Sequence, residues 1–149
     1  MSANFKAIND HFWASPQLTV ADVALAADKG VKLIINNRPD DEEPGQPSNA
    51  VLEDAAHAAG LAYVHIPVTA GLNLEQVQAF IDAIENAGGG LALGFCRSGM
   101  RSTMIWAFAS AAAGRPGAQI AAEAAQAGFD MSGQIASLDA LRAAQEEDE

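Results

Sequence analysis

The residues best suited to chemistry form one short stretch, Cys96-Arg97-Ser98-Gly99-Met100-Arg101-Ser102. An apolar run over residues 91–95 precedes it, and a second apolar run follows from Thr103. A strand, a glycine-containing turn and a helix in this order direct successive backbone N–H groups toward one point at the positive end of a helix dipole. A thiol in that field, with two arginines nearby, is expected to ionise readily and act as a nucleophile. The stretch therefore predicts a reactive cysteine in an anion-binding turn.

Two side chains of this turn carry the predicted reaction, and the role of a third is open. We expect Cys96 to be the nucleophile and Arg101 the ligand of the anion, because a guanidinium can bind such a group through two parallel hydrogen bonds. The alternative for Arg101 is a structural ion pair with one of the many carboxylates. For Arg97 two roles stay open: it binds substrate, or it points into solvent and steers anions.

The other members of the turn are expected to shape the anion site. Ser98, Gly99 and Met100 would contribute backbone N–H groups, and Gly99 suits a position that needs a close approach or a positive φ. Ser102 either hydrogen-bonds the thiolate or caps the following helix.

Composition limits both the size of the fold and its partners. The 149 residues, half of them hydrophobic, predict one domain over 1–149, with residues 1–14 packing on it and 145–149 forming an acidic tail. Nineteen Asp and Glu against eight Lys and Arg give a formal charge of −11. Such a charge argues against nucleic acid or an anionic membrane as a partner. We expect a small anionic substrate instead.

The sequence also contains few signals of export or of metal binding. The first residues lack the pattern of a signal peptide and no apolar stretch has the length of a membrane span, so we expect a cytoplasmic protein. One cysteine and three scattered histidines offer no metal-ligand spacing. We expect no metal and no cofactor.

Strand and helix patterns alternate along the chain. Buried strands are predicted over 31–36, 61–66 and 91–95, and helices over 21–29, 49–59, 74–87, 103–113, 118–127 and 134–144. This alternation predicts a three-layer α/β fold, in which helices cover both faces of a mainly parallel sheet. Ligands of such folds bind at the carboxyl ends of the strands. Cys96, the loop around Arg38 and the loop after Pro67 all fall at that edge.

The long polar loop that follows the first predicted strand is the second candidate element. It covers 37–47 and contains three prolines. Arg38 and Asp40 at its start either bind substrate, with Arg38 contacting a carboxylate or orienting the Cys96 turn, or close the loop as an ion pair. His65 is expected to be a hydrogen-bonded structural residue, and a proton donor in the alternative.

Five blocks of sequence indicate a family. Over nearly its full length, the chain resembles the phosphatase-like domain of the beta-lactamase-hydrolase-like (Blh) family, a group near the dual-specificity tyrosine phosphatases. The resemblance implies a phosphatase-type α/β fold with Cys96 as nucleophile and Arg101 as the anion-binding arginine. The matching blocks are Ser15-Pro16-Gln17-Leu18, Ile35-Asn36-Asn37-Arg38-Pro39-Asp40, Gly45-Gln46-Pro47-Ser48, His65-Ile66-Pro67-Val68 and Phe95-Cys96-Arg97-Ser98-Gly99-Met100-Arg101-Ser102.

Two features depart from the tyrosine phosphatase pattern. Those enzymes place five residues between the cysteine and the arginine, whereas four separate Cys96 from Arg101, the count of rhodanese-type sulfurtransferases. The loop that carries the phosphatases' acidic proton donor reads Thr69-Ala70-Gly71 here. A missing acid would cost roughly 10²–10⁴-fold in ester cleavage. Asp40, Glu42 or Glu43 could replace it only if their loop folds over Cys96.

Three functional hypotheses follow. The first is sulfane-sulfur transfer through a Cys96 persulfide in sulfide or persulfide metabolism, with persulfide or thiosulfate as substrate. The family's fusion to persulfide-dioxygenase-like domains implies a persulfide dioxygenase or another sulfide-oxidising enzyme as partner. The alternative is a phosphatase that forms a Cys96 phosphoenzyme from a phosphate ester. The third is an inactive anion-binding module.

Overall fold

A five-stranded sheet organises the computed structural model, which describes residues 4–147. Its spatial order is β1-β2-β5-β3-β4, with β1 antiparallel to β2 and every other neighbouring pair parallel. The strands are β1 (Lys6–Ala7), β2 (Phe12–Ser15), β3 (Leu33–Asn36), β4 (Ala62–His65) and β5 (Ala92–Phe95). Since β5 lies between β2 and β3, the turn after it starts at the middle of the sheet.

Six α-helices complete the described part of the chain: α1 (Val20–Asp28), α2 (Asn49–Ala58), α3 (Leu74–Asn86), α4 (Met100–Ala112), α5 (Gly117–Gln126) and α6 (Ile135–Glu147). A short 3₁₀ helix (Ser132–Gln134) precedes α6. Thr19, Ser48 and Asn73 cap α1, α2 and α3 by accepting a backbone N–H in the first turn. These caps confirm the three helix starts predicted from the sequence.

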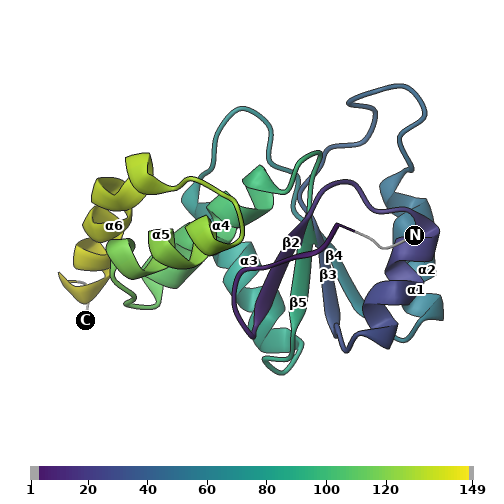
Figure 1. Cartoon of the computed structure of the whole chain (residues 1–149), viewed down its shortest axis with the longest axis horizontal. Coiled ribbons are helices and arrows are strands. Elements are labelled where there is room, and N and C mark those ends of the chain that lie inside the picture. Colours follow the sequence, from purple (N-terminus) through teal and green to yellow (C-terminus); the bar gives the residue numbers. More distant parts are fainter. Residues whose placement is uncertain (1–3, 148–149) are drawn as a thin grey trace.

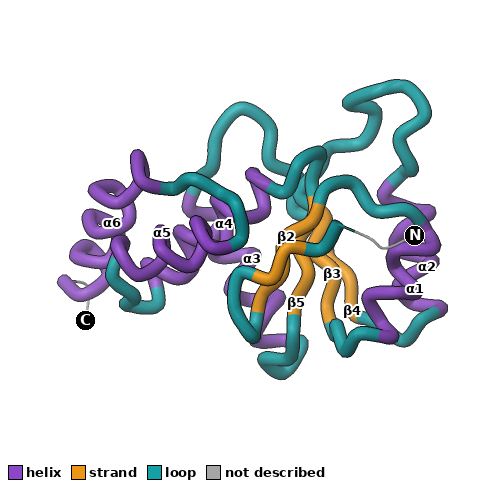
Figure 2. The backbone as a smooth tube through the Cα atoms, in the orientation of Figure 1, coloured by secondary structure: helices purple, strands orange, loops and turns teal. Residues whose placement is uncertain are grey.

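Helices cover both faces of the sheet (Figure 1). α1 and α2 enclose one hydrophobic cluster with the strands, and α3 and α4 enclose the other, to which α5 and α6 also contribute buried side chains while packing on α4. The three-layer α/β fold predicted from the alternation of strands and helices is therefore confirmed. The loops that follow β3, β4 and β5 gather at one edge of the sheet (Figure 2).

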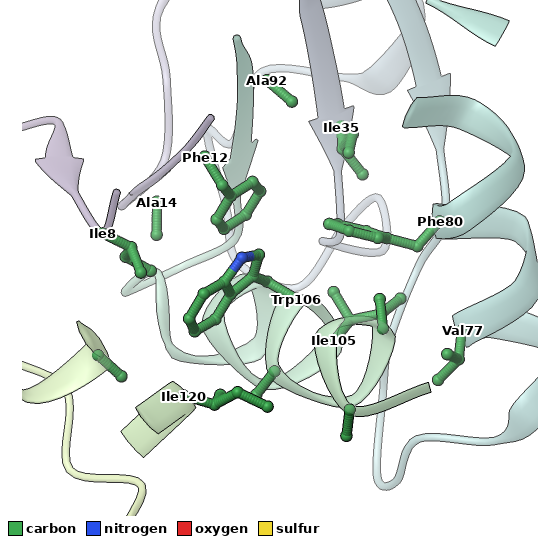
Figure 3. Packing of buried hydrophobic residues seen from close by; sticks show 14 of the residues in the cluster. Ile8, Phe12, Ala14, Ile35, Val77, Phe80, Ala92, Ile105, Trp106 and Ile120 are labelled. Carbon is green, nitrogen blue, oxygen red and sulfur yellow. The ribbon is translucent and has the colours of Figure 1, made fainter. Parts of the chain in front are cut away.

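Aromatic packing holds α4 close to the sheet. Phe12 of β2 stacks on Trp106 of α4 with ring centroids 6.0 Å apart, and the Phe80 ring meets Phe12 edge-on at 5.6 Å (Figure 3). A Cβ at Gly94 would lie 2.9 Å from the Phe12 ring and 3.1 Å from Cβ of Ser102. The glycine thus permits the first turn of α4 to lie directly against β5, which places the candidate turn.

The structure differs from the predicted elements in three places. Residues 6–7 and 12–15 form β1 and β2, strands that were not predicted, because these short segments carry no clear alternation. α4 begins at Met100, three residues before the predicted start. α6 continues through Glu147, whereas the acidic tail was expected from residue 145. The expectations for residues 1–3 and 148–149 lie outside the described residues. Within 4–147, no helix is long and apolar enough to cross a membrane.

Candidate active site

Cys96 lies directly after β5 and at the base of the turn that leads into α4. Its side chain has no exposed surface, and its backbone N–H donates to the Ser15 carbonyl of β2. The backbone N–H of Gly99 donates to Cys96 Sγ over 3.0 Å. The turn therefore closes around the sulfur at the N-terminus of a 13-residue helix, where an anion is stabilised.

Gly99 is required at its position for two reasons. It is the N-cap of α4 and has φ of 96°, in the left-handed region that disfavours side chains. A Cβ there would also lie 3.0 Å from Cζ of Phe129. Thr103 Oγ1 donates to the Gly99 carbonyl and fixes the turn from the helix side.

Ser98, Met100 and Ser102 have different surroundings. Ser98 is exposed, and its Oγ accepts the Met100 backbone N–H at 3.2 Å. Ser102 is fully buried, and its Oγ donates to Asn37 Oδ1 at 2.8 Å. Gly99 occupies the cap of α4 and the Ser102 hydroxyl donates to Asn37, so the structure shows Ser102 in neither expected role, as the helix cap or as the donor to the Cys96 sulfur. Asn37, which the sequence analysis did not select, connects the turn to the loop after β3 and also donates to the Ile66 carbonyl.

Arg101 is held by a carboxylate from the long loop after β3. Its Nη1 and Nη2 donate to the two carboxylate oxygens of Glu42 at 2.7 and 2.8 Å, and Nη1 also donates to the Val68 carbonyl at 2.8 Å. The hydrogen bond to Glu42 raises the pKa of Arg101, burial opposes the rise, and the nearby Cys96 sulfur adds to it. An anion bound in the same bidentate way would have to replace Glu42.

Arg38 is the buried centre of the same loop. Its side chain is only 1% exposed and donates to Glu42 at 2.8 Å, to Glu43 at 3.0 Å and to Gln17 at 2.8 Å. Burial opposes its charge, but the bonds to the two glutamates raise the pKa of Arg38 overall. The predicted pair with Asp40 does not form. Asp40 instead accepts the Asn49 backbone N–H at 2.7 Å, at the start of α2.

His65 and Arg97 complete the predicted set. His65 Nε2 lies 2.9 Å from the Arg38 carbonyl oxygen, a hydrogen-bonded position next to the buried arginine. Arg97 is exposed, and it forms no ion pair with any residue in the described range 4–147. Its carbonyl accepts the Gln17 N–H at 3.4 Å. Within the same range, no group of three or more His, Cys, Asp or Glu side chains is arranged to hold a metal ion.

Glu42 links the two arginines and is the acidic group that the structure brings to the turn. The bond from Arg101 is the largest influence on it and, with the bond from Arg38, lowers the pKa of Glu42 to about 2. In this arrangement the carboxyl is ionised at neutral pH and has no proton to give. From the sequence, Glu42 was only one of three acidic residues whose loop could fold over Cys96.

The low pKa of Glu42 makes a pH-dependent contribution to stability. We expect Glu42→Gln to destabilise the protein at pH 7 by at most about 3 kcal/mol, because a shift from 4.5 to about 2 bounds the linkage energy and solvent around a 28% exposed carboxylate reduces it. Because the pKa of Glu42 is lower in the folded than in the unfolded protein, its ionised carboxylate stabilises the fold at pH values above the unfolded-state pKa. This stabilisation is lost as the pH falls through the folded-state pKa. Urea denaturation should show the difference between variant and wild type shrinking between pH 5 and pH 2. An equal difference at both ends would contradict the assignment.

Comparison with known proteins gives this arrangement a context. The profile of the "Beta-lactamase hydrolase-like protein, phosphatase-like domain" family matches residues 4–113. A beta-lactamase hydrolase-like protein of Xylella fastidiosa is 38% identical over 109 residues, which are 72% of this chain and 25% of that protein. The chain thus spans about a quarter of the length of that relative.

Solved structures agree with the fold. A Neisseria meningitidis protein named "putative phosphatase" has a TM-score of 0.79 at 35% identity, covering 95% of this chain and 100% of that one. The complex of P. aeruginosa TpbA with phosphotyrosine has a TM-score of 0.66 at 18% identity, covering 96% of this chain and 90% of that one. At 18% identity the second likeness concerns the fold alone. With its cysteine turn after β5 and the family profile matched over most of its length, the chain belongs to the beta-lactamase hydrolase-like family through its phosphatase-like domain.

Proposed function

We propose that the chain is a cysteine-dependent phosphatase-type hydrolase of small phosphate monoesters. The observation that carries the proposal is the closure of the turn around Cys96 at the start of α4, with the Gly99 N–H 3.0 Å from the sulfur. The family match and the phosphatase name of the Neisseria relative support hydrolysis over the sulfur transfer that loop length favours.

The proposed reaction has two displacements. The Cys96 thiolate attacks phosphorus, an S–P bond forms and the P–O bond to the leaving group breaks, with its electron pair staying on the leaving oxygen. Water then attacks the phosphocysteine, releasing inorganic phosphate and restoring the thiolate. The turn N–H groups and Arg101 would stabilise the phosphoryl oxygens once the phosphate has replaced Glu42 on the guanidinium.

The test is hydrolysis of p-nitrophenyl phosphate by the wild type and by Cys96→Ser. This substrate suits the site because its nitrophenolate leaves without being protonated. An ionised Glu42 has no proton to give to a leaving group. We expect turnover by the wild type and a fall to the uncatalysed rate in the variant, with phosphate on Cys96 detected by mass spectrometry after an acid quench. Turnover that survives in Cys96→Ser would contradict the assignment of the nucleophile.

Sulfane-sulfur transfer is the second candidate, favoured by the four residues between Cys96 and Arg101 and by the absence of an acid in Thr69-Ala70-Gly71. Here the thiolate attacks the outer sulfur of a persulfide, a thiolate leaves, and the Cys96 persulfide passes that sulfur to an acceptor. A sulfide-oxidising enzyme would then be the partner. Thiocyanate formation from glutathione persulfide and cyanide, lost in Cys96→Ser and unaccompanied by phosphatase turnover, would establish this candidate in place of the first. If neither reaction depends on Cys96, an anion-binding module remains.

A further inference from the structure

A cavity of about 350 Å³ opens beside Arg101, at the same edge of the sheet as the candidate turn. We call it the Met pocket. One wall is the loop over residues 68–72 that follows β4, the other is α4, and Gln134 also lines the cavity. The residues of α4 that line it are Met100, Arg101, Met104 and Phe108.

Most of the lining is apolar, and its large side chains pack against the hydrophobic core. Leu72, Met100, Met104 and Phe108 are all partly buried side chains that pack against the large hydrophobic cluster. Methionine side chains adapt to the shape of an apolar ligand. Within residues 4–147 no acidic residue lines the pocket, and Arg101 is its only charged residue there.

Arg101 connects the Met pocket to the candidate anion site. Arg101 is a lining residue of the pocket, and its Nη1 donates to the carbonyl of Val68, the first residue of the pocket's loop wall. A phosphate held on this guanidinium would therefore have its organic group beside the pocket. The loop wall includes three small residues, Thr69, Ala70 and Gly71, which leave room in the pocket.

We propose that the Met pocket binds the apolar organic group of the substrate and so makes the protein selective for small aryl or alkyl phosphate monoesters. The proposal rests on the hydrolase function proposed above. The volume suits a ring or a short alkyl chain and is small for a folded partner. A formal charge of −11 disfavours acidic peptides and nucleic acids as carriers of the phosphate.

A second cavity supplies a matched control. It has a volume of about 280 Å³, lies against Phe12, Phe80 and Trp106, and shares no residue with the candidate turn. Ile81 lines this second cavity, so Ile81→Trp adds the same ring to an apolar cavity that the proposal does not use.

Binding separates this proposal from the proposed function, because it needs no turnover. In a Cys96→Ser background, calorimetry should show phenyl phosphate binding roughly tenfold more tightly than inorganic phosphate, the gain expected from burying a ring. Leu72→Trp should abolish that gain and leave the affinity for inorganic phosphate unchanged, whereas Ile81→Trp should retain it. Ala70→Trp, at an exposed loop position, repeats the test should Leu72→Trp unfold.

The outcomes are distinct. Equal affinity for the two ligands, or a ring preference that survives both Leu72→Trp and Ala70→Trp, would overturn the proposal even if the wild type hydrolyses p-nitrophenyl phosphate. A ring preference that only the Met pocket variants remove supports it. If the wild type then fails to hydrolyse any phosphate ester, the hydrolase function is wrong and the Met pocket remains a ligand site.

Discussion

Arg101→Ala should lower kcat/KM for p-nitrophenyl phosphate by roughly 10²–10³-fold, the usual cost of removing a donor to developing negative charge. Arg101 carries the cation next to Cys96, and its paired N–H groups already hold a carboxylate with the geometry that a phosphate would use. Arg101→Lys should also lose at least tenfold, because an ammonium is a point donor and cannot reproduce the fork. Steady-state kinetics on the two variants measures both effects.

Glu42→Gln is the control that shows whether Arg101 binds the substrate or only holds the loop through its ion pair with Glu42. Both Arg101→Ala and Glu42→Gln break the same ion pair, but only the first removes the donor to the phosphate. We therefore expect the loss in Arg101→Ala to exceed the loss in Glu42→Gln by tenfold or more. Equal losses would mean that Arg101 acts only through Glu42, as a structural ion pair. Melting curves of both variants should show that they remain folded, since Arg101 and Glu42 are 24% and 28% exposed.

Two parts of the site could be predicted from the sequence. The order of strand, glycine turn and helix places Cys96 and Gly99, and the parallel alternation places the loops after β3 and β4 at the same edge. Both follow from local patterns. The start of α4 was predicted three residues too far along the chain. The N-cap is Gly99 in the left-handed region, which has no capping side chain that would mark the position in the sequence.

The contacts between segments could not be predicted in the same way. Arg38 pairs with Glu42 and Glu43 rather than with its neighbour Asp40, since the prolines and turns of the loop bring the later carboxylates back over the buried guanidinium. β2 is too short to show a strand pattern in the sequence. It joins the sheet by pairing in parallel with β5, which lies 80 residues away, with Phe12 opposite Ala92. The Met pocket likewise depends on the packing of α4, a loop and Gln134, which are distant in sequence.

Arg38→Ala should destabilise the protein by about 3 kcal/mol, the lower end of the range for breaking a buried ion pair. The side chain is 1% exposed and makes three hydrogen bonds to side chains, two of them to carboxylates. The cost stays at the lower end because Glu42 and Glu43, at 28% and 47% exposure, can regain water once their partner is gone. Urea denaturation at pH 7 measures the change.

Arg97→Ala is the matched control for this prediction, because Arg97 is exposed and has no ion pair within residues 4–147. We expect its free energy of unfolding to change by less than about 0.5 kcal/mol. A change in Arg38→Ala as small as that would show that Arg38 does not organise the loop. If Arg38→Ala is destabilised as predicted and its affinity for inorganic phosphate also changes, Arg38 acts on the anion site through Glu42, which is bonded to both arginines.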